Sequence, residues 1–318
     1  MDNWDIGYSS ATENILGAML NTVDIIAVAG SEAASYSMVY GMDAANRSQT
    51  VVAITPASPL EYVLQHCFTV NIIESCGWTR IDTDQQTVLE LLTNGTANYG
   101  SLWGDYLYDF YDTGIGGWDC DGNDETFQLP LGVMVRKTFL EESADNHFVV
   151  ARVLAAWFRA ISYIIQSRKQ VDSVENNDGE IIDYLDEYLN TYYNMSYSQQ
   201  RVKLQESQMI LFSLPTQLEH MNRDNGVGSW DASEWDLHYQ QFTDYLTTAG
   251  ALPTNGTPPA PEDYITDKYL RMIQDNTTLF QFALLGEQPV PVVDAARTGG
   301  GGTGLLAVVF ALGFLLLQ

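Results

Sequence analysis

The stretch VDIIAVA, residues 23–29, decides the fold class of this 318-residue chain. Six of its seven residues are apolar, a run typical of strands that are buried on both faces in parallel sheets covered by helices. A second unit repeats the order, because the apolar run VVAI at 51–54 leads through TPAS into a helix predicted to begin at Pro59. This alternation predicts an α/β fold, whose ligands bind beyond the carboxyl ends of the strands.

Capping signals and apolar spacing predict the helices. Ser10 with Glu13 forms a capping box before residues 11–20, and Ser58 with Glu61 forms another. Gly30 and Ser31 are expected to turn the chain into a second helix that runs through Met38. In the second half, helices are predicted over residues 144–167, 180–189, 198–212 and 235–249.

The composition excludes several classes of protein. Hydrophobic residues make up 46% of the chain, which excludes a disordered tail protein. Asp and Glu number 41 against 14 Lys and Arg, which gives a net charge of −27 and makes nucleic acid an improbable partner. Solubility in a salty exterior also explains this acidity.

No catalytic or metal site is predicted, and no cofactor. Cys67, Cys76 and Cys120 have no CxxC spacing, so a structural zinc site is not expected, although one disulfide could form. The four histidines share no spacing typical of a metal site or a relay: His66, His147, His220 and His238. Neither the glycine-rich 114–117 nor the acidic 119–125 matches a phosphate or calcium loop, and the acidic segment is interpreted as solvated.

Sequons and the C-terminal composition favour a secreted, membrane-anchored protein. A Pro/Gly linker over 289–304 precedes an apolar tail over 305–318, the order of a glycolipid-anchor attachment signal, although a tail that stays attached is the alternative. The N-terminus has no leader, so an incomplete N-terminus is expected. Five sequons predict glycosylation at Asn46, Asn94, Asn194, Asn255 and Asn276.

Two loops could bind an anion, and an aromatic segment could line the site. Ser31 follows the first strand, and Thr55 and Ser58 follow the second, so hydroxyls and N–H groups meet at helix starts, although such residues are also ordinary caps. Trp103, closely followed by Asp105, could supply a wall and a carboxylate for a zwitterion. Tyr106 and Tyr108 are expected in the core.

The order of segments resembles a known family. It is similar to the type II periplasmic substrate-binding proteins of taurine, aliphatic sulfonate and nitrate importers, whose superfamily includes the thiamine-pyrimidine synthases. The resemblance rests on WDIGYSSATENILGAMLNTVDIIAVAGSEAAS at 4–35, VVAITPASPLEYVL at 51–64, TVLELLTNGTANYGSLWGDYL at 87–107, LGVMVRKTFLEESADNHFVVARVLAAWFRAI at 131–161, and the closing region 242–270.

The resemblance implies two α/β lobes that close on a small ligand, with residues 1–48 and 127–288 in lobe 1 and 49–126 in lobe 2. It places Ser31 at the ligand's anionic head, Thr55 and Ser58 in the matching loop of lobe 2, and Trp103 with Asp105 near an aromatic and acidic wall.

The chain departs from the family's pattern at three places. Glu32 stands where sulfonate binders have a small residue, so it would need an ammonium partner and joins the candidate ligand-binding residues. Asp105 lies one position later in the sequence than the aspartate of the family's usual Trp-Asp pair. Only residues 44–50 separate the predicted second helix from Val51, where the family completes lobe 1 and crosses a hinge, and the family's opening strand is absent. An incomplete gene model or a degenerate member is therefore expected.

Three functional classes remain compatible with the sequence. The leading hypothesis is a surface-tethered, extracellular binding protein, not an enzyme, for a small anionic or zwitterionic solute such as taurine, a sulfonate or nitrate, linked to an ABC-type membrane transporter. The alternative is an acidic surface protein that keeps the fold without a ligand. A synthase-like enzyme ranks last, because His66, Cys67 and Cys76 do not reproduce the family's Cys-rich motif and substrate histidine.

Overall fold

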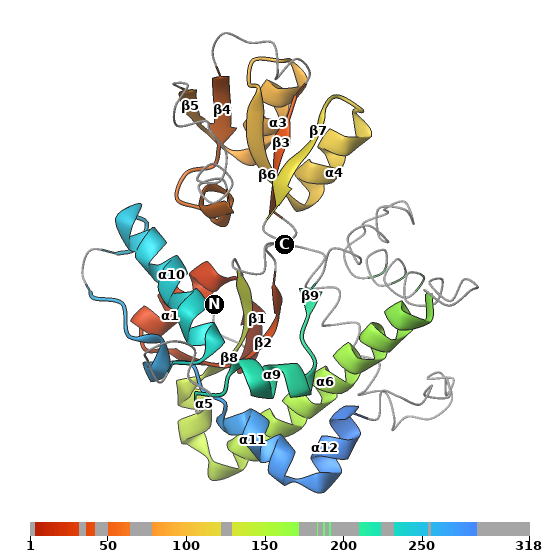
Figure 1. The fold of residues 1–318 in the computed structure, drawn as a ribbon. Helices are drawn as coiled ribbons and strands as arrows, with labels where there is room; N and C mark the ends of the chain where they lie inside the picture. The colour runs from red at the N-terminus through yellow and green to blue at the C-terminus, as the bar shows by residue number, and fades with distance from the viewer. Residues whose placement is uncertain are drawn as a thin grey trace.

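The computed structural model describes two lobes, each built on one sheet (Figure 1). In lobe 1 the strand order is β1 (Ile6–Ser9), β8 (Pro130–Arg136), β2 (Val23–Ser31) and β9 (Ile210–Leu211). In lobe 2 it is β5 (Trp78–Asp82), β4 (Thr50–Ile54), β6 (Tyr99–Trp103), β3 (Tyr36–Tyr40) and β7 (Gly117–Asp121). The described residues are 4–31, 36–41, 50–63, 78–121, 129–171, 183, 187, 191, 210–223, 232–253 and 256–284.

Helices complete the α/β architecture that the sequence predicts. Lobe 2 carries α3 (Gln85–Thr93) and α4 (Gly104–Asp112), and residues 59–63 are also helical. The helices of lobe 1 are α1 (Ala11–Met19), α5 (Lys137–Glu142), α6 (Ala144–Val171), α9 (Leu214–His220), α10 (Glu234–Thr248), α11 (Lys268–Asp275) and α12 (Thr277–Leu284), with a 3-10 turn at Pro261–Asp263.

The first predicted strand is confirmed, but the prediction that it belongs to a parallel sheet is wrong. β2 is buried as predicted, since Ile25, Ile26, Ala27 and Val28 are all inaccessible to solvent. It pairs antiparallel with both β8 and β9, and β8 also pairs antiparallel with β1. β8, the strand by which the chain returns from lobe 2, thus lies between β1 and β2. β1 and β2 run parallel to each other but are not adjacent in the sheet. Parallel pairing occurs in lobe 2, where β4 lies between β5 and β6.

The helix predicted through Met38 is wrong, because the chain forms strand β3 there. β3 pairs antiparallel with β6 and β7 in the sheet of lobe 2. Met38 and Val39 are both buried but belong to different hydrophobic clusters, as expected when neighbouring side chains of a strand point to opposite faces. Residues 36–40 therefore belong to lobe 2 rather than to the lobe 1 segment 1–48.

The chain enters lobe 2 between β2 and β3 and returns between β7 and β8. Both β3 and β4 lie in the sheet of lobe 2, so the crossing from lobe 1 comes before β3 and not at the predicted boundary between residues 48 and 49. Residues 289–304 and 305–318 lie outside the described residues, and the linker and the anchor remain predictions.

The predicted helices over 11–20, 144–167 and 235–249 are confirmed as α1, α6 and α10. The prediction over 198–212 is wrong at its end, where β9 lies, and its earlier part is outside the described residues. In the predicted helix over 180–189, the structure describes only residues 183 and 187, both helical. Ser10 precedes α1 without a side-chain cap, and Glu13 instead accepts a hydrogen bond from Ser9.

Helix α6 is the one described helix that is long and apolar enough to cross a membrane, judged by the length and composition of residues 144–165 alone. Its buried face, which includes Leu154, Phe158 and Ile161, belongs to the main hydrophobic cluster. Arg159 and Ser162 also donate hydrogen bonds to carbonyls near the end of α12. We interpret α6 as the core helix of lobe 1.

Candidate functional site

The candidate site lies where two neighbouring parallel strands of lobe 2 end. β4 and β6 pair in parallel, so their carboxyl ends meet at the same edge of the sheet. Thr55 directly follows β4, and Trp103 is the last residue of β6 and the N-cap of α4. The structure thus brings together two of the predicted site residues that are 48 positions apart.

Gln85, the first residue of α3, joins these two strand ends. Its side chain is 5% exposed, and its Nε2 donates to Thr55 Oγ1 at 2.8 Å and to the Ser101 carbonyl at 3.1 Å. Its Oε1 accepts from the Trp103 N–H at 3.2 Å. The side chain of Asp84 caps α3 by accepting the Thr87 N–H, which fixes the helix start and hence the position of Gln85. Hydrogen bonds from the backbone N–H and the side chain of Thr87 lower the pKa of Asp84.

Ser58 shapes the loop after β4 rather than pointing a free hydroxyl outward. It is 8% exposed, and its Oγ donates to the Thr55 carbonyl at 2.6 Å and accepts the Glu61 N–H at 3.4 Å. Glu61 accepts the Ala57 N–H at 2.6 Å, one residue before the N–H that a regular capping box would use. Ala57 has φ 53°, a left-handed backbone conformation that a non-glycine residue rarely adopts.

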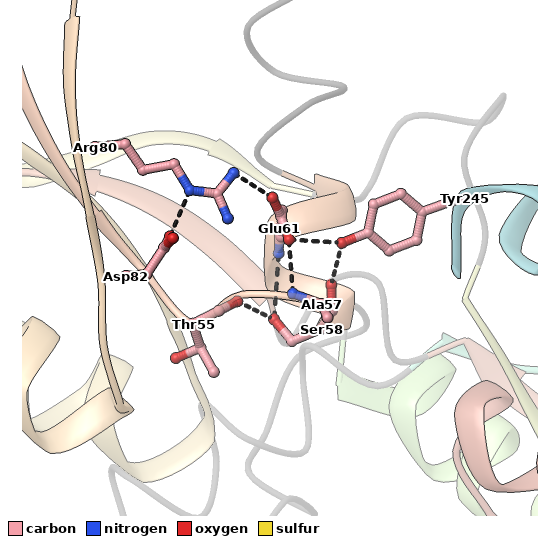
Figure 2. Close-up of polar contacts among 7 residues, drawn as sticks. All are labelled: Thr55, Ala57, Ser58, Glu61, Arg80, Asp82 and Tyr245. Atoms are coloured by element: carbon pink, nitrogen blue, oxygen red, sulfur yellow. Dashed lines mark hydrogen bonds and ion pairs between the residues drawn. The ribbon is translucent and has the colours of Figure 1, made fainter. Parts of the chain in front are cut away.

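Tyr245 of α10 reaches this loop from lobe 1, as Figure 2 shows. Its hydroxyl lies 3.1 Å from Glu61 Oε2 and 3.3 Å from the Ser58 carbonyl oxygen. Burial, followed by the nearby Glu61 carboxylate, raises the pKa of Tyr245, so the phenol stays protonated and donates. Burial likewise raises the pKa of Tyr62, which packs on Tyr245 with ring centroids 4.9 Å apart.

Arg80 of β5 completes the cluster on the lobe 2 side. Its Nη1 pairs with Glu61 Oε1 and its Nε pairs with Asp82, so one guanidinium links two carboxylates (Figure 2). The Glu61 side chain is 7% exposed, whereas that of Asp82 is 52% exposed. The inner carboxylate is therefore the one held in a buried, fully bonded position.

The structure describes only part of the remaining predicted ligand-binding residues. Ser31 ends β2, where its backbone pairs with Pro130 and Ile210, but its side chain lies outside the described set. Glu32 is also outside it. Asp105 is half-buried in the first turn of α4. Tyr108 is buried as expected, and Tyr106 packs against the hydrophobic cluster of lobe 2.

Sequence reasoning missed Gln85, Arg80 and Tyr245 as members of this cluster. Glu61 was recognised only as a cap residue. The apolar run at 51–54 indicated the loop after β4, and the aromatic segment indicated Trp103, but neither signal points to these residues.

Among the residues that the structure describes, no group of three or more His, Cys, Asp and Glu could hold a metal ion. His220 stacks on Trp235 and pairs with Glu234 at 2.9 Å, which supports a packing interpretation. Cys67 and Cys76 are outside the described residues. Of the sequon residues, Asn94 and Asn276 are exposed, and the other three, Asn46, Asn194 and Asn255, lie outside the described part of the chain.

A cavity of about 230 Å³ lies elsewhere, within lobe 1. Its lining includes Asp24, Glu262 and Asp263 beside Arg223 and Lys268, and no predicted site residue contributes to it. The two signs of charge are mixed along its wall, so it favours neither an anion nor a cation.

Three solved structures show which fold this is. A sulfonate-binding protein SsuA from Methylobacillus flagellatus KT aligns with a TM-score of 0.57 at 15% identity, over 87% of this chain and 77% of that one. The SsuA of Escherichia coli gives 0.57 at 12% identity, over 83% and 76%. The nitrate-binding protein NrtA of Synechocystis PCC 6803 gives 0.50 at 9% identity, over 88% and 76%.

The chain has the fold of the type II periplasmic solute-binding proteins. The two-lobed α/β prediction is confirmed. All three neighbours are binding proteins of a sulfonate or of nitrate. No family model matches the sequence, and a search of curated proteins finds no match.

Proposed function

We propose that the protein binds a small anionic or zwitterionic solute between its two lobes, at the carboxyl ends of β4 and β6. The observation that carries this proposal is the Gln85 bridge, which holds Thr55 and Trp103 at one sheet edge. Ligands of open α/β sheets bind at such edges. The hydroxyl of Thr55 would contact the anionic head, while the face of Trp103 and the carboxylate of Asp105 suit an ammonium group. Ser31, at the end of β2, and Glu32, the next residue in the sequence, are the other proposed contacts.

The neighbours support the solute class, since sulfonate and nitrate are small oxyanions. Delivery to an ABC-type transporter at a membrane is part of the same proposal. An extracellular location fits the sequons and the apolar segment 305–318.

A second function, an acidic surface protein that keeps the fold without a ligand, is favoured by one observation. The donor groups at Ala57 and Arg80 are already bonded to the chain's own Glu61.

A thermal-shift screen of the purified full-length chain tests the proposed function. The screen should contain taurine, alkanesulfonates, nitrate, thiamine precursors and amino acids. At least one solute is expected to raise the melting temperature in a concentration-dependent way, because a ligand that binds only the folded state stabilises it. A screen in which no solute has an effect would favour the protein without a ligand.

Trp103→Ala is expected to weaken the affinity for the identified solute about tenfold, since it removes an aromatic wall worth about 1.4 kcal/mol. Isothermal titration on variants shown to be folded would measure this change. His220→Ala, which alters a packing residue far along the chain, should bind like the parent. Equal loss in both variants would indicate general destabilisation and contradict a specific role for Trp103.

Deletion of residues 305–318 should move the protein from the membrane fraction to the medium, because this segment is apolar and uncharged. Cell fractionation followed by immunoblotting measures the shift. Release of the full-length protein by a phosphatidylinositol-specific phospholipase would support a glycolipid anchor, and resistance would support a retained tail. Membrane retention of the deleted chain would refute both forms of anchor.

A further inference from the structure

The carboxylate of Glu61 is bonded from both lobes (Figure 2). Lobe 2 supplies the Ala57 N–H at 2.6 Å and the Arg80 guanidinium, which pairs with Oε1. Lobe 1 supplies the Tyr245 hydroxyl at 3.1 Å. A buried carboxylate is tolerated only when such donors satisfy it, and here the side chain is 7% exposed.

These three donors are of the kinds that bind anionic groups in proteins. Guanidinium groups and backbone N–H groups make the strong, charge-assisted hydrogen bonds to carboxylates and other oxyanions. A hydroxyl that comes from the opposite lobe makes the third contact. The Glu61 side chain thus has the surroundings that the anionic head of a solute would have between two closed lobes.

An apolar contact surrounds this polar bridge. Tyr62, one residue after Glu61, packs on Tyr245 and Phe242 of α10, with ring centroids 4.9 and 5.2 Å apart. Leu60 and Val63 belong to the same buried cluster as the α10 residues. The two lobes therefore touch around the Glu61 carboxylate through the chain's own side chains.

We propose that Glu61 is a built-in anionic ligand, whose carboxylate bridges the lobes in the place that a small external carboxylate or sulfonate would take. The bridge itself follows from the contacts of Glu61 given above. Its effect on which solutes bind rests on the proposed function, because a solute with an anionic head must either displace Glu61 or bind beside it. Removal of the Glu61 side chain should create a site for a small free anion lined by Arg80, Ala57 and Tyr245.

Chemical rescue of the full-length Glu61→Ala variant tests this inference. The melting temperature of the variant is expected to fall by about 3 °C or more relative to the parent. Sodium formate should then raise it in a saturable way, whereas sodium chloride of equal ionic strength should not. The parent, whose site is filled by Glu61 itself, should respond equally little to both salts. Small-angle scattering should give a larger radius of gyration for the variant, and formate should reverse the change.

Asp82→Ala is the matched control. Asp82 pairs with the same Arg80 guanidinium, but its side chain is exposed and lies at the outer end of the cluster. The control should therefore show no rescue by formate. Glu61→Gln should be destabilised and insensitive to formate, because glutamine fills the space that the anion would need.

The outcomes separate this inference from the proposed function. A folded Glu61→Ala protein that formate does not stabilise beyond chloride, or a parent that responds to formate as the variant does, would overturn the built-in ligand. If Glu61→Ala does not fold, Tyr245→Phe replaces it, since it keeps the ring and removes only the bond between the lobes. A Tyr245→Phe protein with the melting temperature of the parent would then overturn the bridge, because the ring contacts are kept and the hydrogen bond to Glu61 is lost. The solute screen of the parent can succeed or fail independently of all these results.

Discussion

Replacement of Asp236 by alanine is expected to lower the free energy of unfolding by about 2–3 kcal/mol, because it removes charge-assisted hydrogen bonds and leaves a buried donor without an acceptor. Asp236 is 3% exposed and accepts hydrogen bonds at 2.8 Å from both Nε and Nη2 of Arg223. It also accepts the Ser233 N–H at 2.8 Å, the second half of the capping box that begins α10. The substitution therefore removes the carboxylate partner of the guanidinium and leaves the buried Ser233 N–H without its acceptor.

Arg223 connects this effect to the rest of lobe 1, because its Nη2 also donates to the Ile265 carbonyl. Ile265 forms an isolated parallel bridge with Ile25 of β2. Urea unfolding monitored by circular dichroism measures the loss. Asp244→Ala on the same helix, at an exposed position, is the control and should change the free energy of unfolding by less than about 0.5 kcal/mol. Equal effects of the two substitutions would contradict a special role for the Arg223 pair.

The elements of the fold that could be predicted are those whose signal lies within one short stretch. The apolar run at 23–29 predicted a buried strand, and the spacing of 144–167 predicted the long helix α6. The antiparallel pairing of the lobe 1 sheet could not be predicted, because β8 pairs with β2 from about a hundred residues away. The sequence of residues 23–29 does not indicate which strand will pair with them.

Strand β3 was missed for a different physical reason. A helix was expected there because Gly30 and Ser31, after the first strand, were interpreted as a turn into a helix. In the sequence YSMVY, the adjacent apolar residues Met38 and Val39 show no alternation that would have indicated a strand. The structure buries both faces of this strand, one in each hydrophobic cluster. A strand of that kind loses the pattern of period two that would have identified it.

The candidate site could be predicted in part, from two different signals. Thr55 was recognised because it follows an apolar run, and Trp103 because an aromatic residue closely followed by Asp105 could line a site for a zwitterion. Gln85 and Arg80 lack any such signal, since their partners Thr55 and Glu61 lie 30 and 19 residues away. Tyr245 is 184 residues from Glu61, so only the folded chain reveals the contact between the lobes.

Gln85→Leu is expected to lower both the stability of lobe 2 and the affinity for a solute. Leucine is similar in size but cannot replace the three hydrogen bonds of Gln85, so the Trp103 N–H and the Ser101 carbonyl lose a buried partner. Each loss costs about 1–3 kcal/mol, and we expect the free energy of unfolding to fall by about 2–3 kcal/mol in total. The affinity should fall at least about tenfold, because Thr55 and Trp103 are no longer held together.

Gln86→Leu is the matched control, since Gln86 is the exposed neighbour and its amide bonds Glu90 on its own helix. Chemical unfolding and titration of both variants with the solute found in the screen measure the two effects separately. If Gln85→Leu loses stability but keeps the parent's affinity, then the solute does not contact the edge formed by β4 and β6. The binding site would then have to be sought away from this edge, because Gln85 is the residue that gives the edge its shape.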